Sequence, residues 1–354
     1  MRAALRGWIA YAVLIALAFA LQRAPIDPNW IENAYANGIY AWLARTFVPI
    51  ANSIPITLGD LVLAAIVGGL VLLWIVRLRR TRGARWRELG LLVVRTAAIV
   101  AAIAIWFDVA WALNYRRAPI VARVAYDRAR VTPASVTAYS KHIVDELNRL
   151  APLAHAEIET PEALQAELAS AYEPVIARLG DRWNVIVSRP KSTVVDLWFE
   201  IAGIGGMWNP FAYETLLNAE FLPFERPFAL AHEWGHVGGF GDESDANLIG
   251  ALTTLRSPDP LIHYSGLFWT YGFLPQADRD KLPVSKLVYA DLLAAHDRFL
   301  RHYNPQLYSF QWFTYDKYLR ANRVSAGVVS YSLFVQVLVG TPLDSQGLPL
   351  LRAE

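Results

Sequence analysis

The chain contains no cysteine in its 354 residues. Disulfide bonds, a thiolate-bound zinc ion and a cysteine nucleophile are therefore excluded, although the compartment stays open because exported proteins need not contain disulfides. Charge is also scarce, since Asp, Glu, Lys and Arg make up 18% of the residues and the formal net charge is +2. With so small an imbalance and no RNA- or DNA-binding motif, the sequence predicts no nucleic-acid partner.

Apolar sequence is what the chain has in excess. Hydrophobic residues make up 55% of it and the mean hydropathy is +0.27, both above the norm for soluble domains. Three apolar runs are long enough to cross a bilayer and predict spans at about 5–22, 56–77 and 91–113. The first run, which two arginines precede, also fits the core of a cleavable signal peptide.

The arginines predict the orientation of these spans. Residues 77–87 carry six arginines, and positively charged loops stay in the cytoplasm. The loop 78–90 is therefore predicted to be cytoplasmic and the loop 23–55 external. The chain divides into a three-helix membrane anchor, residues 1–113, and an external domain, residues 114–354. Four aromatic residues of the external loop predict a short helix lying along the membrane surface: Trp30, Tyr35, Tyr40 and Trp42.

The run His232-Glu233-Trp234-Gly235-His236 matches the H-E-x-x-H pattern. On a helix, two histidines four residues apart share one face and can bind one metal ion. Pro227 suits the first turn of such a helix, and Gly238-Gly239 suits its end. The pattern predicts a Zn²⁺ site in which His232 and His236 are ligands and Glu233 is the general base for a zinc-activated water.

A catalytic zinc ion usually has three protein ligands, so one ligand lies outside this pattern. Asp242 and Glu243 compete for the position, with Asp245 as a further option. We favour Glu243, because it would open a second helix and point back at the metal across a short turn. Ala246 would let the two helices approach closely, and Asn247, one turn after Glu243, would hydrogen-bond a ligand.

The rest of the external domain predicts an α+β fold, mainly helical with a small sheet. N-cap and proline signals open helices at Thr132 and Thr160. Residues 183–222 are rich in β-branched residues and glycine and predict strands and turns. Within them, residues 211–222 precede the H-E-x-x-H run and predict an edge strand that pairs with an extended substrate. Helical patterns follow at 284–301, 306–321 and 328–339.

Several segments resemble an uncharacterised bacterial family of membrane-anchored H-E-x-x-H proteins, catalogued as domain of unknown function 3810. They are residues 54–60, 114–116, 205–211 with Glu214 and Asn218, 243–247, 264–266, 315–319 and 330–332. Family members look like zincin-type metallopeptidases of the glutamate-ligand (gluzincin) branch. The resemblance therefore implies a zincin-like domain, a peptide or protein substrate, and a bacterial inner membrane location with the domain on the periplasmic or extracellular side. Family members usually carry glutamate at both positions that Glu243 and Asp245 occupy in this chain. Glu243 therefore matches the first of these two family positions.

Hydrolysis also needs a donor to the oxyanion that forms in the transition state. Tyr264 is our preferred candidate, with His263 and Tyr213 as alternatives, while Glu214 and Asn218 either shape the pocket or form structural hydrogen bonds. The sequence thus predicts a membrane-anchored zinc metallopeptidase. Two alternatives are a non-catalytic zinc-binding membrane scaffold and a zinc hydrolase of a non-peptide amide of the cell wall.

Overall fold

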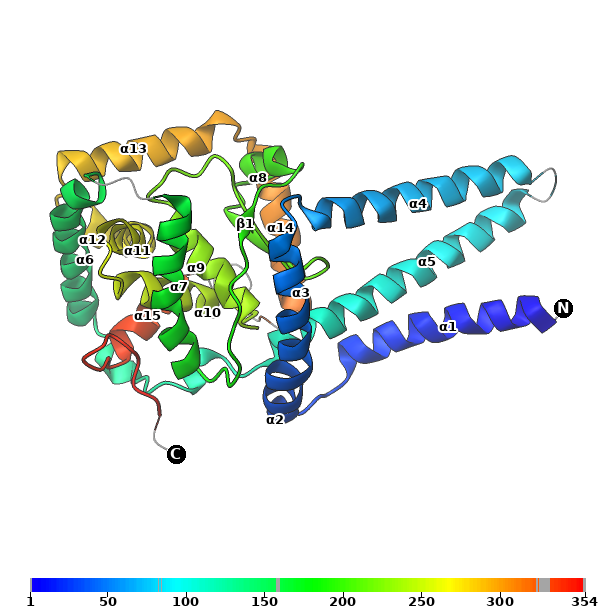
Figure 1. Ribbon diagram of the computed structural model, residues 1–354, viewed down its shortest axis with the longest axis horizontal. Helices are drawn as coiled ribbons and strands as arrows, with labels where there is room; N and C mark the ends of the chain where they lie inside the picture. The colour runs from blue at the N-terminus through cyan, green and yellow to red at the C-terminus, as the bar shows by residue number, and fades with distance from the viewer. Residues whose placement is uncertain are drawn as a thin grey trace.

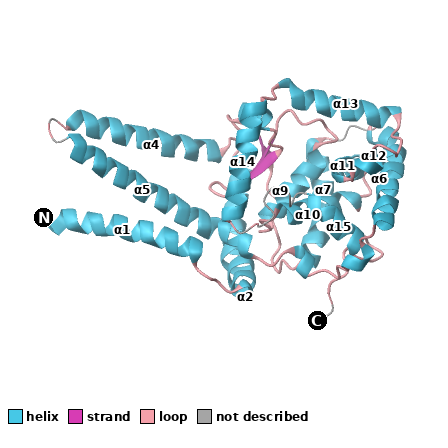
Figure 2. Cartoon of the chain, turned by 180° about the vertical axis from the view of Figure 1, so that it is seen from behind, coloured by secondary structure: helices cyan, strands magenta, loops and turns pink. Residues whose placement is uncertain are grey.

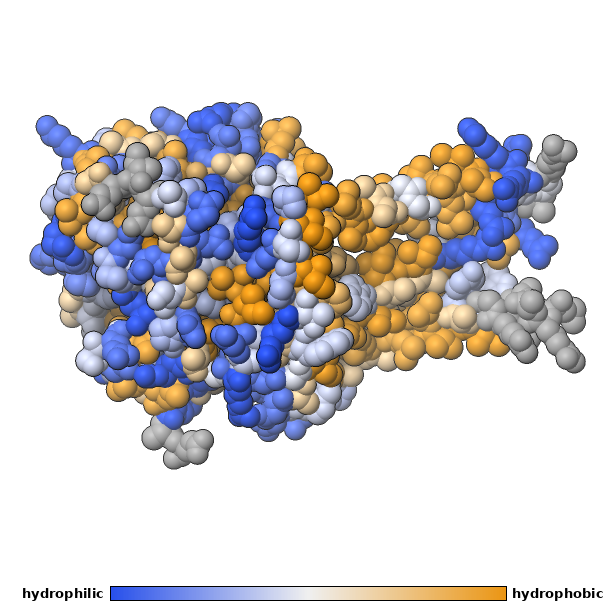
Figure 3. Space-filling model, in the orientation of Figure 1, coloured by the Kyte–Doolittle hydropathy of each residue, from blue (hydrophilic) through white to orange (hydrophobic). Residues whose placement is uncertain are grey.

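Three long helices project side by side from one side of a globular domain in the computed structural model (Figures 1 and 2). The structure describes residues 2–81, 83, 85–156, 160–322, 324 and 332–352. The projecting helices are α1 (Arg2–Arg23), α4 (Leu58–Arg80) and α5 (Arg85–Ala110). Figure 3 shows that apolar residues cover them, which is what contact with lipid requires.

Two of these helices, α4 and α5, are long and apolar enough to cross a membrane. A third span arises only if Trp8–Arg23 and Pro28–Ser53, which meet at a bend of 101°, are counted together. Two of the predicted spans thus correspond to candidate membrane helices, and the three-helix anchor stays a prediction.

Residues 23–55 form helices that belong partly to the domain core. They are α2 (Pro28–Trp30), the π-helical η1 (Ile31–Tyr40) and α3 (Ala41–Ser53). Trp30 and Trp42 are exposed, as a helix at the membrane surface requires, but Tyr35 and Tyr40 are buried. The prediction that all four aromatics face the membrane is therefore wrong for these two tyrosines. Their helical spacing with Ile31 places them on the inward face, so the core extends across the predicted boundary at residue 113.

The remaining helices form the globular domain, and two of them begin at the N-cap signals that the sequence predicts. Thr132 caps α6 and Thr160 caps α7 through their side-chain oxygens. The helices are α6 (Pro133–Ala154), α7 (Pro161–Arg178), α8 (Asp196–Ala202), α9 (Arg226–Val237), α10 (Glu243–Leu255), α11 (Pro260–Phe273), α12 (Gln276–Arg279), α13 (Lys286–Arg301), α14 (Pro305–Ala321) and α15 (Leu333–Gly340), with short 3-10 turns η2 (Ala112–Arg116), η3 (Ile120–Ala122) and η4 (Arg128–Arg130). Of the predicted helix 328–339, residues 328–331 lie outside the described part of the chain.

A small sheet completes the predicted α+β fold. It consists of β1 (Pro190–Lys191), β2 (Gly206–Asn209) and β3 (Glu214–Leu217) in the order β1-β3-β2. The strand β3 is parallel to β1 and antiparallel to β2. The prediction of an edge strand within 211–222 is therefore wrong, because β3 is paired on both sides. The strand at the edge beside α9 is β2. A tight turn joins β2 to β3, so the two strands pair as antiparallel neighbours.

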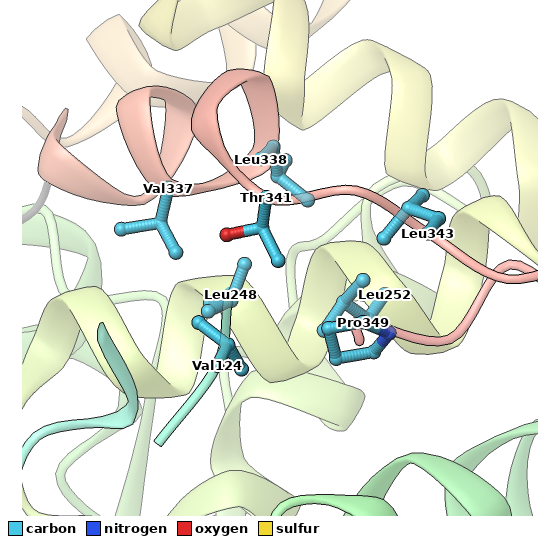
Figure 4. Close-up of a pocket in the computed structure, with 8 residues that line it drawn as sticks. All are labelled: Val124, Leu248, Leu252, Val337, Leu338, Thr341, Leu343 and Pro349. Carbon is cyan, nitrogen blue, oxygen red and sulfur yellow. The ribbon is translucent and has the colours of Figure 1, made fainter. Parts of the chain in front are cut away.

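Helices α9 and α10 pack against each other at the centre of the domain, with α7 and α11 beside them. The face of α10 opposite α9 contacts the C-terminal segment around α15, where a small apolar cavity lies between them (Figure 4). Its lining holds no acid or base, and it belongs to the packed core that supports α10.

Candidate metal centre

Helix α9 places the two histidines of the H-E-x-x-H run one turn apart. It begins at Arg226 with a proline in its first turn and ends at Val237, as the sequence predicts. Gly239 has a φ of 82°, a left-handed conformation that favours glycine, and its N–H donates to the carbonyl of His236 at 2.9 Å. The chain therefore reverses at once and enters α10.

Small residues let α9 and α10 approach closely. A Cβ atom built on Gly235 would lie only 3.2 Å from the Cα atom of Ala246. This close approach brings the first turn of α10, with Glu243, beside the histidines, which is the role predicted for Ala246.

The structure brings His232, His236 and Glu243 together. Glu243 Oε2 lies 3.2 Å from His232 Nε2 and 3.6 Å from His236 Nε2. One donor atom from each residue lies within 4.8 Å of the others. The competing carboxylates are used elsewhere: Asp242 caps α10 by accepting from Ser244 N, and Asp245 accepts from Ile120 N.

Hydrogen bonds on the far side of each imidazole fix its orientation. His232 Nδ1 lies 2.8 Å from Asn247 Oδ1, and His236 Nδ1 lies 2.7 Å from the carbonyl oxygen of Phe240. Both partners accept, so each Nδ1 carries the proton and each Nε2 is left as a potential ligand. The contact predicted for Asn247 is thereby confirmed.

Without a metal ion, His236 Nε2 can also hold a proton, and the nearby carboxylate of Glu243 favours that proton. Although burial acts in the other direction, Glu243 raises the pKa of His236 to about 9. Burial likewise opposes ionisation of Glu243, but the two imidazoles hold the pKa of its carboxyl well below the usual range. The three side chains thus form a buried pocket of ligand atoms that attracts a cation.

Glu233 lies next to this group, against the edge strand β2. It is 5% exposed, and its Oε2 atom has no hydrogen-bond partner among the described residues. Burial raises the pKa of its carboxyl, while His232 and His236 act against that shift. A buried oxygen without a partner is costly, so such an atom is expected where a ligand or water will bind.

A buried ionic cluster supports the turn between α9 and α10, and sequence reasoning missed it. Arg117 donates to Gly238 O at 2.9 Å and to Asp181 and Glu32 at 2.8 Å each. Its guanidinium also stacks over the ring of Phe240, 4.3 Å from the centroid. Arg117 therefore holds Phe240, whose carbonyl oxygen orients His236. In the sequence, only the position of Arg117 next to segment 114–116 indicated a role for it.

The predicted oxyanion donors lie in other contacts. Tyr264 OH donates to Asp291 Oδ2 at 2.5 Å, and its ring packs against His155 and Phe224. The structure therefore places our preferred donor in a separate network, because α11 turns this side chain toward α13. Tyr213 OH donates to Ala110 O at 3.1 Å.

His263 and the two polar residues of the β3 region are also engaged away from the histidines. Burial lowers the pKa of His263, which lies near Glu146 and Arg149. Glu214 accepts from the backbone N–H groups of Leu58 and Gly59, each at 2.9 Å, and Asn218 donates to Ile204 O. Their hydrogen bonds are structural.

The hydroxyl group of Tyr315, on α14, reaches the site. It donates to Glu243 Oε1, the carboxylate oxygen not turned toward the histidines. Sequence reasoning did not select it, although it opens segment 315–319, one of those that carry the family resemblance.

The donor set fits a zinc ion. Two imidazole nitrogens and one carboxylate oxygen are the protein ligands of one class of catalytic zinc site, which leaves a coordination position open. The unpartnered Oε2 atom of Glu233 lies in the same buried region.

One family model matches most of the chain. The model described as "Protein of unknown function (DUF3810)" matches residues 35–339. The chain belongs to this family. No curated protein and no solved structure matches it. The family match begins within η1 and ends within α15, so it covers the core helices of residues 35–53 and the whole candidate metal centre together with the domain.

Proposed function

We propose that the chain is a membrane-anchored, zinc-dependent metallopeptidase. The observation that carries the proposal is the convergence of His232, His236 and Glu243 beside Glu233, a buried carboxylate with an unpartnered oxygen. A purely structural zinc site is normally closed by four protein ligands, whereas these three ligands leave one position open beside a buried acid. This acid therefore favours a hydrolase over the non-catalytic scaffold.

Each side chain of the site has a separate role in the proposed hydrolysis. A bound zinc ion would supply Lewis-acid chemistry, which acidifies water and polarises a carbonyl group. Glu233 Oε2 accepts the proton of the attacking water and delivers it to the amide nitrogen that leaves, so the carboxylate is regenerated. The hydroxyl group of Tyr315 exchanges its hydrogen bond to Glu243 for one to the developing oxyanion and keeps its proton.

The edge strand β2 supports a peptide substrate. It pairs with β3 along one side, and Gly206 at its start lies against Glu233. An extended peptide that added to the other side of β2 would run past the carboxylate, as in strand addition to sheet edges generally. This placement favours a polypeptide over a small cell-wall amide.

The arginines support a location of the domain outside the cytoplasm. The last turn of α4 carries Arg77, Arg79 and Arg80, and this end points away from the domain, as does the N-terminus (Figure 1). Positive ends of spans stay in the cytoplasm. We infer a multi-pass protein of the bacterial inner membrane with its domain on the periplasmic or extracellular side.

Metal analysis and substrate profiling of purified wild type and Glu233→Gln test the proposal. Both proteins should contain one zinc ion, and the variant should lose about 10²- to 10⁴-fold in peptide hydrolysis because only the base is removed. Glu146→Gln, far from the site, is the matched control and should keep full activity. Unchanged turnover in Glu233→Gln would remove the proposed base, and zinc without any turnover in wild type would favour the scaffold.

A further inference from the structure

Helix α14 has one face on the metal centre and another that is exposed and apolar. On the inward side, Tyr315 donates to Glu243. On the outward side, Phe310 is 62% exposed, Phe313 is 64% exposed and Leu307 is 37% exposed. A row of large apolar side chains at helical spacing is unfavourable in water and marks a surface that contacts something apolar.

Two attachments fix where this helix lies. Near its N-terminal end α14 packs on α8, and the segment before α8 is bound to the first turn of α4, where Asp60 accepts from Thr193 Oγ1 at 2.6 Å and from Val194 N at 2.9 Å. Near its C-terminal end, the ring of Tyr318 lies 6.3 Å from that of Phe107 on α5. Seen from both sides, α14 crosses the bases of α4 and α5 (Figures 1 and 2).

Other apolar residues are exposed at the same level of the molecule. Val194 and Leu197, at the start of α8, are 81% and 56% exposed, and Trp42 on α3 is 64% exposed. Apolar residues continue from the projecting helices onto the adjoining edge of the domain (Figure 3). Helix α14 lies at this same edge of the domain, across the bases of α4 and α5 (Figures 1 and 2). Lys317 Nζ lies 5.3 Å from the Phe313 ring centroid, the arrangement of a cation that reaches from an apolar face toward lipid phosphates.

We propose that the outward face of α14 contacts the lipids of the external leaflet, so that the helix covering the metal centre lies in the bilayer interface. This inference rests on the membrane anchoring in the proposed function. Its consequence concerns the substrate. The side chains of His232 and Glu243 are only 13% and 4% exposed, and Tyr315 closes over them. A substrate must therefore enter beside α14, which makes a polypeptide segment at the membrane surface the substrate class.

Spin labels on the full chain in lipid nanodiscs test the lipid contact, and the absence of native cysteine makes single labels straightforward. Labels at Phe310→Cys and Phe313→Cys should collide more often with oxygen than with a water-soluble nickel chelate. Tyr289→Cys is the matched control, because Tyr289 is 56% exposed and belongs to the first turn of α13, a helix that begins beside α6 at the end of the domain away from the spans (Figure 1). Labels at 310 and 313 that behave like the label at 289 would overturn the proposal.

A label at Leu72→Cys on α4 separates this result from failure of the anchor. Leu72 is 61% exposed on a candidate span, so an aqueous signal there would refute the membrane anchoring itself. None of these readouts needs hydrolysis, so a protein without peptidase activity still reports the contact. For the substrate class, the double variant Phe310→Ser/Phe313→Ser should cleave a lipid-tethered peptide at least about 10-fold more slowly than wild type while soluble-peptide cleavage is retained. Equal loss on both peptides would contradict a membrane-surface substrate.

Discussion

Gly206→Ala tests whether the position of Glu233 against the edge strand matters for hydrolysis. A Cβ atom at Gly206 would lie 2.7 Å from Glu233 Oε1 and 3.0 Å from both its Cγ and Leu216 O. Ordinary contacts begin near 3.4 Å, so the carboxylate must shift by about 0.7 Å. Leu216 belongs to the central strand and cannot give way easily. A displacement near 1 Å costs about 10²-fold in rate, so we expect kcat to fall by about 10- to 100-fold.

The assay for this variant combines peptide turnover with zinc content. Zinc content should be unchanged, because the atoms nearest to the new methyl group belong to Glu233 and Leu216 and not to the three proposed ligands. Gly272→Ala on α11 is the matched control, since nothing lies within 4 Å of its added Cβ atom. If Gly206→Ala turned over peptide at the wild-type rate with full zinc, the carboxylate position that we assign to the general base would be refuted.

Three further substitutions test separate contacts of the site. Tyr315→Phe removes the proposed oxyanion donor and should lower kcat by about 10²-fold at unchanged zinc content; an unchanged kcat would make the hydroxyl structural. Asn247→Ala removes the partner of His232 Nδ1 and should weaken zinc binding by about 10- to 100-fold in chelator competition, and equal affinity would contradict that role. Although burial opposes it, Arg117 and Arg123 lower the pKa of Glu32 from 4.5 to about 2. The ionised Glu32 therefore stabilises the fold above pH 4.5 and loses this effect as pH falls toward 2, so the thermal stability deficit of Glu32→Gln at pH 6 should shrink below pH 4.5; a constant deficit would rule out this linkage.

The parts of the site that lie on one helix and the next could be predicted from the sequence. Helical spacing alone places His232 and His236 on one face, and a glycine turn brings Glu243 back to them. Asn247 follows from the same periodicity. These contacts span few residues, so local geometry decides them.

Contacts between distant segments were the ones that sequence reasoning missed or misplaced. Tyr315 lies 72 residues after Glu243, and Arg117 lies 121 residues before Gly238. Tyr264 follows the ligands closely in the chain, yet α11 turns it toward Asp291. The pairing order of three short strands is likewise set by tertiary packing, which is why β2 and not β3 holds the edge.

Helix α4, a candidate membrane span, and strand β3 share one buried carboxylate, which connects this span to the candidate site. Glu214 on β3 accepts from the first N–H groups of α4 and from Lys191 Nζ at 2.5 Å. A Cβ atom on Gly59 would lie 2.1 Å from Asn209 Nδ2, so the start of α4 is pressed against the end of β2. At its other end, β2 contacts Glu233. A tilt of α4 would therefore displace β2, the strand against which Glu233, the proposed general base, is packed.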